Sequence, residues 1–328
     1  MRAIQITELS GPTSALRLAD IPEPEPSHAL TPGSGVIVDV HAAGVSFPEL
    51  LQTRGEYQIK PPLPFVPGAE VGGVVRSAPD DAAVKPGDRV AAFCMIGGFA
   101  EVAVAPAYFT FKVPDSFDFA QAAGLVLNYH TAYFALQIRG RLAPGDSVLV
   151  HGAAGGVGTA SIQVAKGLGA RVIGVVSSDE KERVAREAGA DEVIRSDGRW
   201  KEEAKELSDG GVDVVLDPVG GERFTDSLRS LAEGGRLVVV GFTAGSIPEV
   251  RVNRLLLSNT EVVGAGWGAY VLARPERTAQ IAGAVQELID GGFVNPVVGA
   301  RHPLEQAGDA LVALDKRGAI GKVVLEVD

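Results

Sequence analysis

The sequence has little cysteine and no long apolar run. Cys94 is the single cysteine among 328 residues. A disulfide within the chain and a structural four-thiolate zinc site are therefore excluded. No 18 consecutive residues are apolar, and the N-terminus turns polar after a few residues. We therefore expect neither a membrane span nor a secretory leader, and we expect a cytoplasmic protein with no membrane partner.

Positive charge is also scarce. Lys and Arg number 30 against 41 Asp and Glu, which gives a formal net charge of −11. This balance argues against general binding to nucleic acid or to anionic membranes, although a local basic pocket for one phosphate is compatible with it. Glycine, in contrast, is abundant at 41 residues and follows no collagen-like period. The excess predicts many tight turns and close backbone approaches in an otherwise ordinary globular composition.

The first third of the chain is predicted to be mainly β. Residues 36–40 and 71–75 are rich in valine; the first range follows a Pro- and Gly-containing turn at 31–35, and the second contains two glycines. The proline-rich stretch 60–68 cannot form a helix, because each proline moves the preceding residue out of the α region. The pattern changes at residues 119–138, where apolar residues recur at helical spacing without proline. We therefore expect a mainly β region to end near residue 122.

Strands and helices alternate after residue 146. Alternation of this kind predicts an α/β unit with a doubly wound parallel sheet. The strands are expected at residues 147–150, 171–176, 192–194, 212–216, 236–240 and 261–264, with a last strand at 322–325. The helices are expected at residues 159–169, 179–188, 221–231 and 278–290.

A glycine-rich loop at residues 152–158 is the strongest local signal. A buried strand enters it and a helix leaves it, which is the context of a dinucleotide-binding loop. Ala153 stands where the first glycine of G-x-G-x-x-G is usual. No Gly-Lys-Ser/Thr closes a Walker loop, and the alternative is a glycine-rich turn without a ligand. The residues predicted to contact a cofactor here are Ala154, Gly155, Gly156, Val157 and Gly158.

The end of the second strand of this unit favours NADPH over NADH. An NAD site usually has an acidic residue there, whereas this chain has two serines before Asp179, which we expect to cap the next helix. The serine hydroxyls and nearby cations can bind a 2′-phosphate. The alternative is that Lys181 is a solvated helix residue. The predicted ligands of this phosphate are Ser177, Ser178, Lys181 and Arg195.

Taken together, these motifs resemble the medium-chain dehydrogenase/reductase superfamily, in particular its zinc-independent quinone oxidoreductase branch. The segments that carry the resemblance are residues 44–49, 63–75, 85–90, 142–146, 148–158 and 321–325.

The resemblance implies two domains. A GroES-like, mainly-β catalytic domain would comprise residues 1–122 and 292–328, and a Rossmann dinucleotide-binding domain residues 123–291. It also implies an active site in the cleft between them and a homodimer paired through the last strand of the nucleotide domain, around residues 262–264.

Comparison with the zinc-dependent members of the superfamily predicts a site without metal. Those members have Cys where Ser46 stands and His where Ala69 stands, and neither residue present replaces a zinc ligand well. Glu70 of the same motif is present, and we favour a structural role for it. The resemblance thus implies NADPH-dependent hydride transfer to a quinone or an enone, that is, to a conjugated carbonyl acceptor. The alternatives are an enoyl-thioester or alkenal double-bond reductase, and a non-catalytic, crystallin-like NADPH-binding protein.

The resemblance also assigns individual residues. The candidate catalytic residues are Ser46, Tyr57, Asn128 and Thr131. The further cofactor contacts are Gly241, Phe242, Trp267 and Lys322. Several residues have alternative roles. Tyr57 could pack on a strand edge, Thr131 could cap a helix, and Trp267 could belong to the core or a dimer interface. Lys322 could be a surface residue, and His130 could be a general acid or purely structural.

Overall fold

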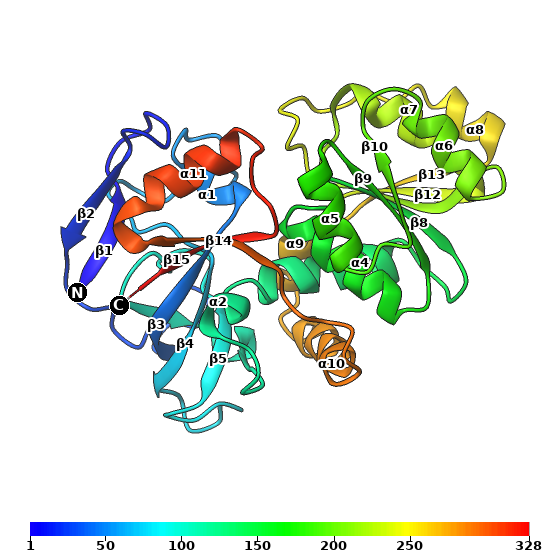
Figure 1. The fold of residues 1–328 in the computed structure, drawn as a ribbon. Helices are drawn as coiled ribbons and strands as arrows, with labels where there is room; N and C mark the ends of the chain where they lie inside the picture. Colours follow the sequence, from blue (N-terminus) through cyan, green and yellow to red (C-terminus); the bar gives the residue numbers. More distant parts are fainter. Residues whose placement is uncertain (328) are drawn as a thin grey trace. The chain divides into compact units, whose positions relative to one another are not determined.

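The computed structural model describes residues 1–327, and these form two compact units. The first unit comprises Met1–Leu127 and the chain from Pro296 onward, so it contains both ends of the chain, and the second is Asn128–Asn295 (Figure 1). These boundaries differ by a few residues from those predicted. The reason is that residues just after 122 still pack on the first unit: Gly124 lies against the Lys322 side chain, and the Leu127 N–H donates to Glu70.

The first unit contains a mixed, mostly antiparallel sheet in the order β14-β15-β3-β4-β5-β7, with β6 paired to β3. Valine-rich β3 and β15 supply much of its core, together with apolar residues of α11, which packs against α1 (Figure 1). The strands of this sheet are β3 (Val36–Val45), β4 (Glu70–Ser77), β5 (Arg89–Phe93), β6 (Val102–Ala105), β7 (Thr110–Lys112), β14 (Val298–Pro303) and β15 (Lys322–Glu326).

Shorter elements complete this unit. Strands β1 (Arg2–Ile6) and β2 (Leu16–Asp20) form a separate antiparallel pair. The α-helices are α1 (Phe47–Gln52), α2 (Phe119–Ala122) and α11 (Ala307–Asp315), with 3-10 turns at Ala107–Phe109 and Leu304–Gln306. Helix α2 lies close against β4, because a Cβ at Gly72 would lie 2.2 Å from the Phe119 carbonyl oxygen. The glycine within the predicted strand 71–75 thus serves a close backbone approach.

The second unit has a six-stranded, wholly parallel sheet in the order β10-β9-β8-β11-β12-β13. The order reverses between β8 and β11, as in a doubly wound dinucleotide-binding fold, and the predicted fold class is confirmed. The strands are β8 (Ser147–His151), β9 (Arg171–Val176), β10 (Glu192–Arg195), β11 (Val212–Asp217), β12 (Leu231–Val239) and β13 (Glu261–Gly264).

The helices of the second unit pack in two groups. Helix α4 contacts α5 and α10, whereas α6 contacts α7 (Figure 1). Trp200 of α6 and Phe224 of α7 enter the same apolar cluster as Leu149 and Ile173 of the sheet. The helices are α4 (Gly156–Gly167), α5 (Asp179–Glu187), α6 (Trp200–Leu207), α7 (Phe224–Arg229), α8 (Asn253–Ser258), α9 (Trp267–Leu272) and α10 (Arg277–Asp290), with a 3-10 turn at Gly221–Arg223.

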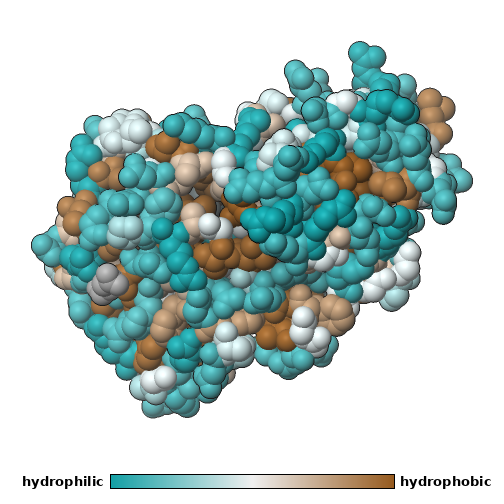
Figure 2. All heavy atoms as spheres, in the orientation of Figure 1, coloured by the Kyte–Doolittle hydropathy of each residue, from teal (hydrophilic) through white to brown (hydrophobic). Residues whose placement is uncertain are grey.

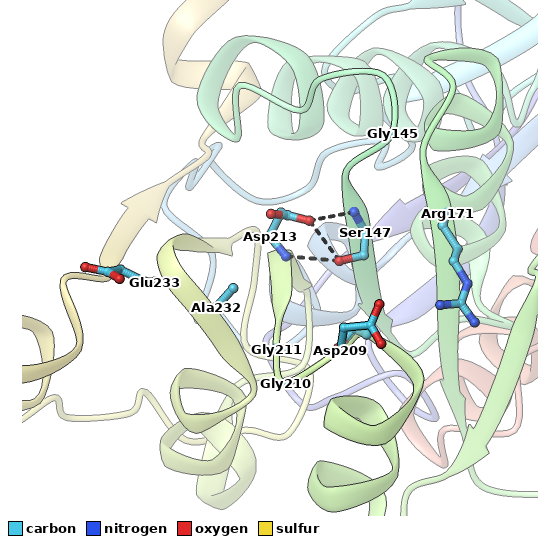
Figure 3. Close-up of a pocket in the computed structure, with 10 residues that line it drawn as sticks. Gly145, Ser147, Arg171, Asp209, Gly210, Gly211, Asp213, Ala232 and Glu233 are labelled. Atoms are coloured by element: carbon cyan, nitrogen blue, oxygen red, sulfur yellow. Dashed lines mark hydrogen bonds between the residues drawn. The ribbon is translucent and has the colours of Figure 1, made fainter.

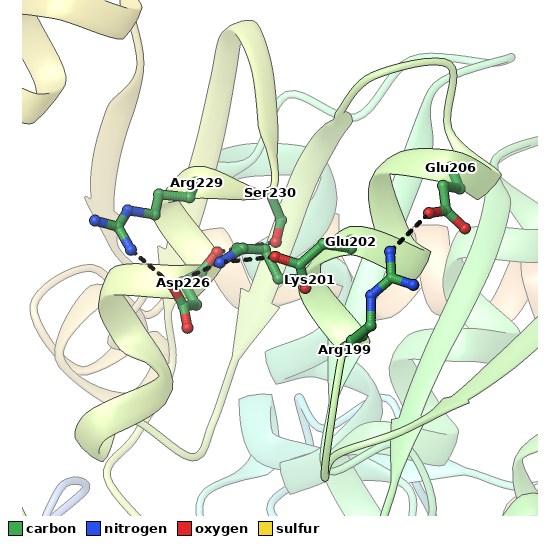
Figure 4. Close-up of polar contacts among 7 residues, drawn as sticks. All are labelled: Arg199, Lys201, Glu202, Glu206, Asp226, Arg229 and Ser230. Carbon is green, nitrogen blue, oxygen red and sulfur yellow. Dashed lines mark hydrogen bonds and ion pairs between the residues drawn. The ribbon is translucent and has the colours of Figure 1, made fainter.

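Ion pairs join α6 and α7 at the surface. Lys201 of α6 lies 3.4 Å from Asp226 of α7, which also accepts from Arg229, while Arg199 pairs with Glu206 (Figure 4). Exposed pairs of this kind each contribute at most about 1 kcal/mol. The apolar cluster beneath them therefore holds the two helices together.

The helix predicted over 119–138 is not continuous. It consists of α2, a π-helical segment Val126–His130, the short α3 (Thr131–Tyr133) and a second π-helical segment Phe134–Arg139. The Leu127 N–H donates to the Glu70 carboxylate at 2.9 Å, which gives this part of the backbone a side-chain partner near the break. The spacing of apolar residues in the sequence gives no sign of the hydrogen bond between Leu127 and Glu70. None of the helices within residues 1–327 is long and apolar enough to cross a bilayer.

Candidate functional site

The glycine-rich loop joins the end of β8 to the start of α4. Gly152 has a φ of +60°, a conformation that favours glycine, and its carbonyl accepts from the Gly155 N–H at 3.0 Å. Ala153 is fully buried, and its N–H donates to Val175 of β9. The left-handed conformation of this turn therefore belongs to Gly152. The G-x-G-x-x-G motif would have placed it one residue later, at Ala153. Because Ala153 does not need that conformation, alanine fits there.

The loop and the helix start fit a diphosphate. A Cβ at Gly158 would lie 2.1 Å from the Gly152 carbonyl oxygen, so only glycine allows α4 to pack this closely on the turn. At Gly155, in contrast, a Cβ would meet a single atom within 4 Å, the Gly152 oxygen at 3.5 Å. The first N–H groups of a helix lack acceptors within the helix, and they favour negative charge. Gly155 thus leaves open space beside N–H donors.

Two further loops lie at the same carboxyl edge of the parallel sheet. Gly152 lies beside Val219, which follows β11. The Thr243 N–H, just after the predicted contacts Gly241 and Phe242, donates to Pro218 at 3.2 Å. The carboxyl edge is where open α/β sheets bind ligands. The structure therefore brings Gly241 and Phe242 together with the glycine-rich loop.

The residues 128–131 lie near the start of α4 and are largely buried. Asn128 packs against Gly156, because a Cβ there would lie 2.7 Å from the Asn128 amide nitrogen. Thr131 begins α3 and does not cap it. The ring of His130 lies edge-on to Trp267 with centroids 5.8 Å apart, and burial lowers the pKa of His130 to about 3. His130 is neutral and only 2 % exposed, which favours a structural role over a role as general acid. Trp267 is 3 % exposed, so its ring lies in the core.

The residues predicted to bind a 2′-phosphate follow β9. The Lys181 ammonium lies 3.4 Å from the Ser177 hydroxyl, so these two predicted ligands are adjacent. Ser178, and not Asp179 as predicted, caps α5, since its hydroxyl accepts from the Lys181 N–H at 3.3 Å. The guanidinium of Arg195 pairs with Asp179 and, at 3.0 Å, with Glu182. Of the predicted ligands, Ser177 and Lys181 therefore lie side by side, whereas Arg195 is engaged by carboxylates.

A buried polar cluster occupies the first unit. The Lys322 ammonium donates to Glu70 and, at 2.6 Å, to the Ser46 hydroxyl. Lys322 and Glu70 are 3 % and 1 % exposed, whereas Ser46 is partly exposed. This burial rules out the alternative interpretation of Lys322 as a surface residue. Its ammonium is bound by Glu70 and Ser46, so we assign it to this cluster and not to the cofactor phosphates.

Sequence reasoning missed Glu49, which is also buried in the first unit. Its carboxylate accepts from the Ser46 N–H and from the Ala69 N–H, each at 2.9 Å. Burial raises the pKa of Glu49 to about 7, although the Lys322 charge and these N–H bonds oppose the rise. Burial, and then the Glu49 charge, also raise the pKa of Tyr57, which keeps its phenol protonated as a hydrogen-bond donor. Glu49 follows Ser46 at the capping-box spacing, which is the signal that could have found it.

The residues at the expected zinc-ligand positions determine the capacity of this unit to bind a metal ion. Ser46 and Ala69 stand at them, and the Ser46 hydroxyl already accepts from Lys322. Within residues 1–327, no group of three or more His, Cys, Asp or Glu side chains is arranged to hold a metal ion. The donor set present therefore does not fit a zinc ion.

A pocket of about 580 Å³ lies at the opposite edge of the parallel sheet (Figure 3). Ser147 and Arg171, the first residues of β8 and β9, line it together with Asp213 near the start of β11. The Ser147 N–H and hydroxyl both donate to Asp213, at 2.8 and 2.9 Å. The pocket thus lies at the amino ends of the strands and is not part of the glycine-rich site.

Comparison with known proteins agrees with both units. Residues 32–115 match the family model "Alcohol dehydrogenase GroES-like domain", and residues 156–298 match "Zinc-binding dehydrogenase". The chain is 38% identical over 330 residues to quinone oxidoreductase-like protein 2 of Mus musculus, covering 99% of this chain and 92% of that protein. It is 36% identical over 331 residues to the quinone oxidoreductase of Rattus norvegicus, covering 99% and 97%.

A solved structure also matches the whole chain. A mycobacterial protein complexed with NADPH superimposes with a TM-score of 0.89 at 35% identity, covering 99% of each chain. The fold and the matches define an oxidoreductase built from a GroES-like unit and a dinucleotide-binding unit. The chain belongs to the medium-chain dehydrogenase/reductase superfamily, in its quinone oxidoreductase branch.

Proposed function

We propose that this chain is a metal-free, NADPH-dependent oxidoreductase that reduces a quinone or another conjugated carbonyl acceptor. One observation carries the proposal. The chain combines a glycine loop shaped for a diphosphate with a first unit in which Ser46, bound by Lys322, and Ala69 stand where zinc-dependent members have ligands. The mycobacterial neighbour complexed with NADPH and the quinone oxidoreductases of rat and mouse support this cofactor and this acceptor class.

The chemistry divides between cofactor and protein. Bound NADPH supplies hydride, which with one proton reduces the acceptor and leaves NADP⁺. The residues of this chain bind the cofactor, orient the acceptor and stabilise the negative charge that develops on its oxygen. Ser46 and Tyr57 are the hydroxyl donors that we assign to that oxygen, while Asn128 and Thr131 are assigned to the nicotinamide side of the site. A conjugated acceptor is activated without a Lewis acid, so no metal is required.

The test is stopped-flow oxidation of bound NADPH by a panel of quinones, enones and enoyl thioesters, before and after dialysis against a chelator. We expect rapid turnover of quinones or enones that dialysis does not change. Preferential turnover of enoyl thioesters would instead identify a thioester double-bond reductase. Tight NADPH binding without turnover of any acceptor would support a cofactor-binding protein, and loss of turnover on dialysis would contradict the metal-free mechanism.

The 2′-phosphate assignment predicts the effect of Lys181→Ala. Because Lys181 lies beside the Ser177 hydroxyl, its loss removes a charge-assisted contact to the phosphate. We expect the Kd for NADPH to rise about tenfold, with the Kd for NADH unchanged. Fluorescence titration measures both values. Arg183→Ala is the matched control, because Arg183 lies on the same helix and pairs with Glu187. An unchanged NADPH preference in Lys181→Ala would remove Lys181 from the site.

We also propose a homodimer paired through β13. This strand ends the six-stranded sheet, so one edge of it is open to another strand. The neighbouring α8 exposes large apolar side chains, with Leu256 and Leu257 at 76% and 79% exposure, and Figure 2 displays hydrophobic atoms at the surface where α8 lies. We expect the double variant Leu256→Glu/Leu257→Glu to sediment as a monomer. Leu18→Glu, at a 48% exposed leucine of β2, should leave the assembly intact.

A further inference from the structure

The buried cluster of the first unit holds a positive charge directly beside a partly exposed hydroxyl. The Lys322 ammonium donates to the Ser46 oxygen at 2.6 Å and forms an ion pair with Glu70. Ser46 thereby accepts a hydrogen bond from a group that has three donors and no acceptor. The hydroxyl hydrogen of Ser46 therefore cannot point toward Lys322 and must donate elsewhere.

Three features hold the ammonium in this place. Glu70 accepts from Lys322 through Oε1, and its Oε2 accepts from the Leu127 N–H at 2.9 Å, so the carboxylate cannot rotate freely. A Cβ at Gly44 would lie 2.7 Å from Lys322 Cε, and a Cβ at Gly124 would lie 3.2 Å from its Cγ. Two glycines thus make the channel through which the lysine stem passes. The ammonium itself is almost fully buried.

The hydroxyl is fixed from its backbone side as well. Ser46 is the N-cap residue of α1, and its N–H donates to Glu49 at 2.9 Å. Hydrogen bonds thus fix both the backbone N–H and the hydroxyl oxygen of Ser46. Only the hydroxyl hydrogen can still rotate, about the bond between Cβ and the oxygen. An adjacent, desolvated positive charge polarises the O–H bond and strengthens its donation to a developing negative charge.

We propose that Lys322 is a positioning residue, which directs the Ser46 hydroxyl as a polarised donor to the acceptor oxygen. The inference rests on the proposed function. The acceptor gains hydride and its oxygen becomes negatively charged before a proton from solvent neutralises it, and no covalent bond to Ser46 or Lys322 forms. Glu70 keeps the ammonium aimed at Ser46. The Lys322 ammonium thus places a positive charge beside Ser46, the residue that stands where zinc-dependent members have a cysteine.

The kinetic test is a double-mutant cycle of Ser46→Ala and Lys322→Met. Losing a donor to an oxyanion should lower kcat with the best acceptor about 100-fold for Ser46→Ala and about tenfold or more for Lys322→Met. Because Lys322 acts through Ser46, the double variant should lose no more than Ser46→Ala alone. The Kd for NADPH should stay within about twofold in all three variants. Multiplying losses, or a selective loss of NADPH affinity in Lys322→Met, would overturn the proposal.

Two further variants keep the test decisive. Glu70→Gln/Lys322→Met removes both buried charges together, which avoids an uncompensated carboxylate if the single variant fails to fold. We expect it to fold and to show the same loss of kcat as Lys322→Met, and wild-type turnover in it would contradict the inference. Lys166→Met is the matched control, because it breaks a Lys–Asp pair with Asp191 outside the site and should leave kcat unchanged.

An equilibrium measurement separates this inference from the proposed function. 4-Nitrophenol is titrated by absorbance against the NADP⁺-bound protein, because its ionised oxygen resembles the charged acceptor oxygen. The wild-type chain should favour the bound phenolate about tenfold over the Ser46→Ala and Lys322→Met variants. If that preference appears while no acceptor is reduced, the proposed function fails and the positioning role stands. If acceptors are reduced and the preference is absent or equal in all variants, the positioning role fails alone.

Discussion

Gly158→Ala is expected to destabilise the nucleotide-binding unit and to abolish tight NADPH binding. The new methyl group would lie 2.1 Å from the Gly152 carbonyl oxygen and 2.8 Å from the backbone of Ala153. These are backbone atoms of the turn that β8 and α4 share, so the helix must move away from the strand. Overpacking of this kind costs about 1–3 kcal/mol. Because the displaced helix start carries the N–H groups that we assign to the diphosphate, we expect the Kd for NADPH to rise more than about tenfold.

Gly155→Ala separates these two effects. Gly155 has a φ of −81°, which alanine adopts without strain, and a Cβ there would make only an ordinary contact with the Gly152 oxygen. Chemical denaturation should therefore give a free energy of unfolding within about 1 kcal/mol of the wild type. Isothermal titration should still give an NADPH Kd raised about tenfold or more, because the methyl group fills the space left for the phosphates. Wild-type NADPH affinity in Gly155→Ala would contradict the placement of the diphosphate at this loop.

The contrast between these glycines shows what the sequence predicted well and what it did not. Alternating apolar strands and helices, with a glycine loop between β8 and α4, predicted the parallel sheet and its carboxyl-edge loops correctly. Local chemistry specifies such elements, because each short strand is followed by a turn residue and a helical pattern. The motif frame still placed the critical turn at Ala153, whereas the left-handed conformation belongs to Gly152. A one-residue shift of this kind depends on backbone angles that spacing does not encode.

The buried cluster was beyond sequence reasoning for another reason. Ser46 and Lys322 are separated by 276 positions, and they meet because β15 pairs with the end of β3, with Val323 opposite Val45. No local pattern reports a pairing over that distance. The valine-rich 322–325 strand was predicted, but the direction of the Lys322 side chain depends on register. The partner of Glu70 was missed for the same reason.

Glu49→Gln is expected to remove a pH-dependent loss of stability. Glu49 has a pKa of about 7 in the folded chain against 4.5 as its ordinary value, chiefly because it is buried. Below pH 4.5 the carboxyl is protonated in both states and carries no penalty. Between pH 4.5 and 7 the unfolded chain releases this proton and the folded chain retains it, so the free energy of unfolding falls as pH rises. The shift corresponds to about 3 kcal/mol, fully expressed above pH 7.

The measurement is the difference between the unfolding free energies of the wild type and Glu49→Gln from pH 4.5 to 8. A difference is needed because the buried imidazoles of His130 and His151, whose pKa values burial lowers to about 3, destabilise the fold in the opposite direction as pH falls. These imidazoles are common to both proteins and cancel. We expect wild type minus variant to decrease by about 3 kcal/mol across this range and to level off above pH 7. A flat difference would contradict the raised pKa of Glu49. When both proteins also carry Lys322→Met, the pKa of Glu49 should rise further, because the Lys322 charge lowers it in the wild type. The difference should then continue to decrease above pH 7.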